Sequence, residues 1–158
     1  MKVKFIKDDD FVNYYKCSLF IGAPTCDWKC CKEAGVDVCQ NLDVVRQPTI
    51  EIDDDKLIQR YLSNPITKAI VFGGLEPMLQ FEEVYNFIDK LRWEYSCFDP
   101  VVIYTGYNAD EITDEWSMLS KFDKIIIKFG RFIPNQAKHY DETLGVWLIS
   151  DNQYAKEL

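Results

Sequence analysis

The sequence has little positive charge and no long apolar run. Across 158 residues, 18 Lys and Arg stand against 26 Asp and Glu, which gives a net charge of −8. Proteins that grip nucleic acid through its phosphates need clustered Lys and Arg, so the balance argues against direct nucleic-acid binding. No apolar segment approaches the ~20 residues of a membrane span, so we expect no membrane partner.

Other scarcities limit the fold and the chemistry. The single histidine, His139, lies in a polar stretch without ligand spacing, which disfavours a catalytic role. A complete eight-unit (β/α) barrel needs about 250 residues, more than are present. No repeat or linker divides the sequence, so we expect one domain over residues 1–158. The basic start lacks the apolar core of a signal peptide, and we expect a cytoplasmic protein.

Cysteine, in contrast, is abundant. Four of the six cysteines form the pattern Cys26-x3-Cys30-Cys31-x7-Cys39. Disulfides are rare in the cytoplasm, and thiols at short spacing suit tetrahedral zinc or an iron–sulfur cluster. Because adjacent cysteines rarely ligate one ion without strain, three usable thiols would leave one metal position open. Ordinary buried cysteines and a redox disulfide are the alternative interpretations.

Apolar strands alternate with amphipathic helices along the chain. We expect strands at 17–22, 68–72, 100–104 and 123–129, and helices at 53–62, 80–95 and 110–119. This order predicts an α/β fold with parallel strands joined by right-handed crossovers. Four segments each follow a strand: the cysteine loop (residues 26–39), Gly73-Gly74, Thr105-Gly106 and Phe129-Gly130. We therefore expect them to meet at the sheet edge where such folds bind ligands.

The order of several motifs resembles the radical S-adenosylmethionine (SAM) superfamily, and within it the short activating enzymes of anaerobic ribonucleoside-triphosphate reductase. The similarity runs from about Cys17 to Tyr154. It is carried by SLFIGAPTCDWKC, CQN, GGLEPMLQ, VVIYTGY, GRF and the closing DETLGVWLISDNQY.

The resemblance implies an oxidoreductase with a [4Fe-4S] cluster and SAM as cofactors. It also implies a radical-SAM-like partial (β/α) barrel of parallel strands. In that superfamily three cysteines leave one iron free for SAM, and reduction releases a 5′-deoxyadenosyl radical. The expected partners are the anaerobic ribonucleotide reductase, which would receive a glycyl radical, and a low-potential electron donor such as flavodoxin or ferredoxin.

The cysteine pattern departs from the superfamily's C-x3-C-x2-C, because Glu33 stands where the third cysteine would fall. An insertion after Cys30 restores the match and makes Cys39 the third ligand after Cys26 and Cys30. Cys31 is the alternative third ligand. The resemblance also implies that Gly73, Gly74 and Glu76, in a motif altered by the inserted Leu75, bind SAM, and that Val38 and Gln40 flank its adenine or methionine end. Thr105 follows a strand at the same sheet edge, so we expect it to line the pocket as well.

These departures keep two further functions open. One is a radical SAM enzyme that acts on a different peptide or a small molecule. The other is a non-catalytic module that binds zinc or a cluster and has kept the fold. The Gly-Gly-Leu-Glu-Pro and Tyr-Thr-Gly-Tyr segments argue against the second, because a structural zinc module needs neither.

Overall fold

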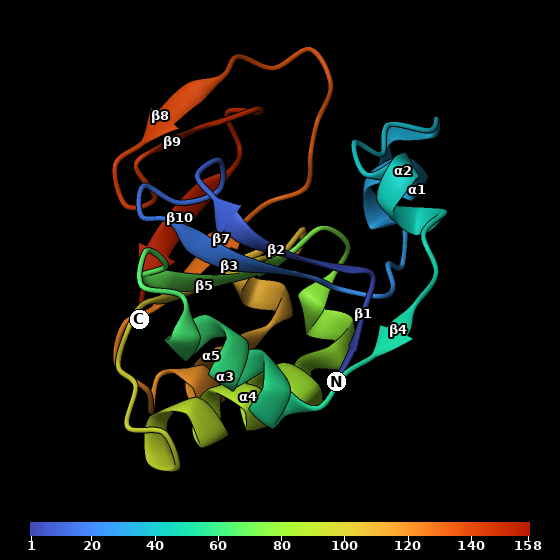
Figure 1. The fold of residues 1–158 in the computed structure, drawn as a ribbon. Coiled ribbons are helices and arrows are strands. Elements are labelled where there is room, and N and C mark those ends of the chain that lie inside the picture. Colours follow the sequence, from blue (N-terminus) through green and yellow to red (C-terminus); the bar gives the residue numbers. More distant parts are fainter.

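The computed structural model describes residues 1–158 and has a six-stranded sheet at its centre, in the order β10-β7-β6-β5-β3-β2 (Figure 1). The four inner strands are parallel, and nearly all of their residues are buried. They are β3 (Ser18–Gly22), β5 (Ala69–Gly73), β6 (Val101–Tyr104) and β7 (Ile125–Phe129). Such continuous apolar runs are typical of strands covered on both faces.

Antiparallel strands close both edges of the sheet. At one edge β2 (Phe5–Asp10) pairs with β3, and at the other β10 (Tyr154–Glu157) pairs with β7. Two small two-stranded sheets lie apart from it: β1 (Lys2–Val3) with β4 (Ile50–Glu51), and β8 (His139–Asp141) with β9 (Val146–Leu148). The structure is therefore a mixed α/β fold, and its relation to a partial barrel stays a prediction.

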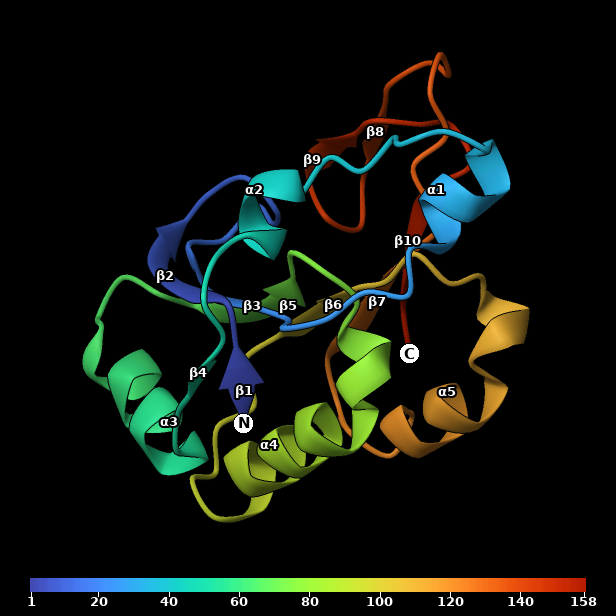
Figure 2. The same cartoon turned by 90° about the vertical axis from the view of Figure 1, so that its right-hand side faces the viewer.

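Three helices cover one face of the sheet, as Figures 1 and 2 both show. They are α3 (Asp54–Ser63), α4 (Phe81–Trp93) and α5 (Thr113–Leu119). Alternate residues of each inner strand face these helices and form the larger apolar core. The β8–β9 hairpin lies toward the opposite face, over a smaller core that includes Phe20, Val102 and Leu148.

The expected strands and helices are present, with one difference. The segment expected as one helix over 110–119 begins with a separate 3-10 turn, η2 (Ala109–Glu111), before α5. A second 3-10 turn, η1 (Pro77–Gln80), precedes α4. The short helix α1 (Lys29–Ala34) lies in the cysteine loop, and the short helix α2 (Leu42–Val45) follows it. None of the helices has the length and apolar character that crossing a bilayer requires.

The N-terminus of α3 gives a first testable prediction. The Asp53 carboxylate accepts hydrogen bonds from the backbone N–H groups of Asp55 (2.9 Å) and Lys56 (3.4 Å). Asp53→Ala should lower the free energy of unfolding by about 1 kcal/mol, because both donors lose their cap. Asp53→Asn keeps an acceptor at the same place and should lose much less. Thermal unfolding of the two variants measures the difference, and equal losses would contradict the capping role.

Candidate functional site

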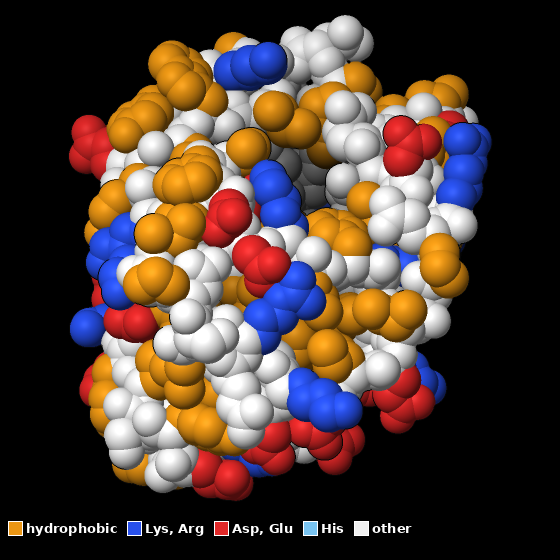
Figure 3. Space-filling model, in the orientation of Figure 1, with side chains coloured by type: hydrophobic (Ala, Val, Ile, Leu, Met, Phe, Trp, Pro, Cys, Tyr) orange, Lys and Arg blue, Asp and Glu red, His pale blue; other side chains and the backbone are white.

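A cavity of about 600 Å³ opens at the carboxyl ends of the parallel strands. In Figure 3 the surface is hollowed between the β8–β9 hairpin and the segment that carries α1 and α2. Its walls come from the cysteine loop, the ends of β5, β6 and β7, the strand β2 with the turn after it, and the C-terminal segment. The structure thus brings the strand-end motifs to one site, as the topology predicts.

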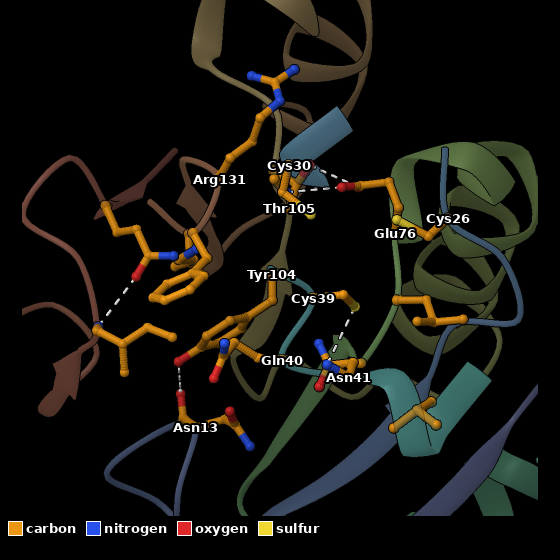
Figure 4. Close-up of a pocket in the computed structure, with 18 of the residues that line it drawn as sticks. Asn13, Cys26, Cys30, Cys39, Gln40, Asn41, Glu76, Tyr104, Thr105 and Arg131 are labelled. Atoms are coloured by element: carbon orange, nitrogen blue, oxygen red, sulfur yellow. Dashed lines mark hydrogen bonds between the residues drawn. The ribbon is translucent and has the colours of Figure 1, made fainter. Parts of the chain in front are cut away.

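Three of the four clustered cysteines line this cavity. Cys26 precedes α1, Cys30 lies in its first turn and Cys39 lies between α1 and α2; the three surround the same space in Figure 4. Cys31 does not line the cavity, and its Sγ instead lies 3.4 Å from Oδ1 of Asp37. Cys39 therefore shares the cavity with Cys26 and Cys30, whereas Cys31 lies outside its lining.

Backbone amides already point at two of the sulfurs. The N–H of Trp28 donates to Sγ of Cys26 at 3.4 Å, and the N–H of Asn41 donates to Sγ of Cys39 at 3.3 Å. Hydrogen bonds of this kind tune iron–sulfur clusters. Trp28 has a left-handed backbone, with φ of 62°, which turns the chain between Cys26 and α1.

Burial makes these thiols reluctant to ionise without a metal. Desolvation is the main cause that raises the pKa of Cys26 and of Cys39, and it raises the pKa of Cys30 to about 12 together with the neighbouring Cys31. Repulsion from the charge of at least one other of the four clustered cysteines also raises the pKa of each of these thiols. Because a metal binds thiolate, loading the site must release protons.

Glu76 lies at the same site, only 5% exposed. Its carboxylate accepts hydrogen bonds from Oγ1 of Thr105 (2.7 Å) and from the N–H groups of Gly106 (2.8 Å) and Met78 (3.1 Å). A carboxylate has about four acceptor sites, so one is left for a ligand. Burial is the main influence on the Glu76 carboxyl and raises its pKa, and a cationic ligand group would counter that effect.

The two glycines at the end of β5, Gly73 and Gly74, differ in role. Gly74 lines the cavity with φ of +81°, a conformation that favours glycine. Gly73 does not line the cavity, and a Cβ there would come within 3.0 Å of the Phe20 ring and 3.2 Å of Cβ of Tyr104. Gly73 is thus required by packing beneath the site, whereas Gly74 brings backbone to its surface.

The remaining predicted residues Val38, Gln40 and Thr105 all line the cavity. The cavity is also lined by Tyr104, which no sequence pattern marked as a site residue. Tyr104, whose Oη donates to the carbonyl of Asn13 at 2.6 Å, faces the cysteine loop in Figure 4. Its place in the Tyr-Thr-Gly-Tyr motif is the only sequence feature that could have indicated Tyr104 as a site residue.

No three Cys, His, Asp or Glu side chains converge tightly enough to hold a single metal ion. The three thiols are instead distributed around one cavity. Thiolates at short spacing are the ligands of tetrahedral zinc and of iron–sulfur clusters, so the chemistry of the donor set suits either group. The three thiols, the amides that point at two of them and the cavity together form a candidate metal or iron–sulfur centre.

A sequence model of the family described as "4Fe-4S single cluster domain" matches residues 15–155. The chain therefore belongs to this family of iron–sulfur cluster domains. No curated protein and no solved structure matches the chain significantly.

Proposed function

We propose that this protein is a radical SAM enzyme that cleaves SAM reductively and installs a glycyl radical on anaerobic ribonucleotide reductase. The observation that carries the proposal is that three thiols, rather than four, share one cavity with the Glu76 carboxylate. Three ligands leave one iron of a four-iron cluster without a protein ligand. We further propose that the four parallel strands correspond to a partial radical SAM barrel.

The proposal assigns Cys26, Cys30 and Cys39 to the cluster. Bound together, the cluster and SAM supply the one-electron chemistry that yields a 5′-deoxyadenosyl radical. The protein binds, orients and shields these groups. The acceptor site left on Glu76 suits the amino group of SAM, since a charge-assisted hydrogen bond there would offset the burial of the carboxylate.

Other lining residues provide shape. Gly74 allows the backbone to approach a ligand closely, because it has no side chain. Val38 and Gln40 flank Cys39 and would contact the ligand from the cysteine loop, and Thr105 would contact it from the end of β6. Thr105 also positions Glu76 through the 2.7 Å hydrogen bond.

The rim of the cavity supports a protein substrate. Val12 and Trp147 line the cavity, yet they are 69% and 66% exposed. Large apolar side chains exposed at the mouth of a site are typical of surfaces that contact another protein. The altered cysteine spacing and the inserted Leu75 favour, as the second candidate, the same chemistry on a different peptide or small molecule.

Formation of 5′-deoxyadenosine tests the proposed reaction. The protein, reconstituted with iron and sulfide without oxygen, should convert SAM to methionine and 5′-deoxyadenosine when dithionite is added. Cys30→Ser should form none, because the cluster loses a ligand. Chromatography of the quenched mixture measures both products. A protein that holds its cluster but never forms 5′-deoxyadenosine would be a binding module and not a radical SAM enzyme.

The partner needs its own experiment. Purified anaerobic ribonucleotide reductase, added to the reaction above, should develop the electron paramagnetic resonance (EPR) doublet of a glycyl radical. If 5′-deoxyadenosine forms and the doublet does not, the second candidate is correct, and the substrate is another peptide or a small molecule.

A further inference from the structure

The cysteine loop has little apolar attachment to the rest of the protein. Helix α1, which carries Cys30, buries none of its residues and has no side-chain cap at its N-terminus. It spans only six residues, too few to be stable alone. Something other than a packed apolar face must therefore fix Cys26 and Cys30 relative to the sheet.

Polar contacts from the segment that follows β6 meet the loop on residues between these two cysteines. Oη of Tyr107 donates to Oδ2 of Asp27 at 2.8 Å. The ammonium of Lys29 donates to Oε1 of Glu111 at 3.1 Å, and it lies 4.2 Å from the centre of the Tyr107 ring. Both contacts join residues about 80 positions apart in the sequence.

Glu111 is itself held firmly. Its Oε1 accepts a 2.6 Å hydrogen bond from Nη2 of Arg131, and its Oε2 accepts from the N–H of Asn108 at 2.8 Å. The hydrogen bond from Arg131 is the main cause that lowers the pKa of Glu111 to about 2, so the carboxylate stays charged. Nε of Arg131 also lies 3.3 Å from Oε1 of Glu33, on the far side of Cys30.

We propose that Tyr107, Glu111 and Arg131 form a clamp that positions the cysteine loop, so that retention of the cluster depends on residues that do not ligate it. The clamp holds the loop at Asp27, Lys29 and Glu33, which lie on both sides of Cys30. Replacing a residue that orients a metal ligand without binding the metal itself commonly changes metal affinity by about 10–100-fold. The inference rests on the cluster ligands, and it does not require SAM cleavage.

Glu111→Gln tests the clamp with little change of shape. The matched control is Asp8→Asn, which also turns an arginine-paired carboxylate into an amide; Asp8 pairs with Arg60 at 2.6 Å, and neither residue lines the cavity. Loss of iron to a chelator, followed by absorbance, should be about 10-fold faster in Glu111→Gln than in Asp8→Asn. Tyr107→Phe, which keeps the ring but loses the bond to Asp27, should also lose iron faster.

Hydrogen exchange of the apoprotein separates positioning from general stability. In Glu111→Gln, amides 26–34 should exchange faster, while those of the inner strands stay as in the wild type. Equal iron loss in Glu111→Gln and Asp8→Asn, or exchange that increases evenly over the whole chain, would overturn the clamp. Neither iron loss nor hydrogen exchange uses SAM, so both results are independent of whether the protein cleaves SAM.

Discussion

Cys39→Ala is expected to abolish binding of the cluster, whereas Cys31→Ala is expected to keep it. Cys39 lines the cavity with Cys26 and Cys30, and its sulfur accepts the amide of Asn41. Cys31 is outside the lining, and its sulfur contacts Asp37 at 3.4 Å. Each replacement removes one thiol from the same loop, so the two variants are matched controls for each other.

Iron analysis and the brown absorbance of the cluster measure this difference. Cys31→Ala should retain close to four irons per chain after anaerobic reconstitution, and Cys39→Ala should retain almost none, since two thiolates hold a four-iron cluster poorly. Loss of iron in Cys31→Ala together with retention in Cys39→Ala would reverse the assignment of the third ligand.

Lys128→Met is expected to stabilise the protein at neutral and acidic pH. Lys128 lies in the wall of the cavity, 6% exposed, and its ammonium donates to the carbonyl of Gly130 at 2.8 Å without a carboxylate in ion-pair distance. Burial lowers the pKa of Lys128 to about 7, and the charge of Glu76 offsets this only in part. The folded state therefore holds this proton less tightly than the unfolded chain.

The sign of the pH dependence follows from that difference. Between about pH 10.4 and pH 7 the unfolded chain carries a proton on Lys128 that the folded protein lacks, so lowering the pH through this range destabilises the fold. Below pH 7 both states are protonated and the penalty is constant. Lys128→Met removes the penalty, which we put at roughly 2–4 kcal/mol.

Thermal and denaturant unfolding at several pH values test this prediction. At pH 6 the variant should melt several degrees above the wild type, at roughly 2–4 °C per kcal/mol. The exposed Lys121 gives the control, since Lys121→Met should change little. If the difference in melting temperature between the wild type and Lys128→Met is the same at pH 6 and at pH 10, the stability does not depend on the protonation of Lys128 and the prediction is wrong.

The central strands were predictable from sequence because each is a short apolar run followed by a turn. The edges were not. β2 reads Phe-Ile-Lys-Asp-Asp-Asp and β10 reads Tyr-Ala-Lys-Glu, and neither has the apolar character that marks a buried strand. These strands are held by backbone pairing to an inner neighbour, which leaves little trace in the side chains.

The candidate site was predictable in part for a related reason. The cysteine spacing indicates a metal centre, and strand-end motifs must share an edge in a parallel sheet. Spacing did not separate Cys39 from Cys31, since that depends on which thiol faces the cavity. The partnership of Lys29 with Glu111 was also hidden, because it joins the loop to a turn 82 positions away and has no local pattern.

The EPR spectrum of the reduced cluster, recorded with and without SAM, tests the central claim most directly. An iron without a protein ligand should bind SAM, and the spectrum of the reconstituted wild-type protein should therefore change when SAM is added. Glu76→Gln should need more SAM for the same change, because a charged acceptor is lost. A reduced cluster whose spectrum is identical with and without SAM would contradict the open iron, and with it the proposed radical SAM function.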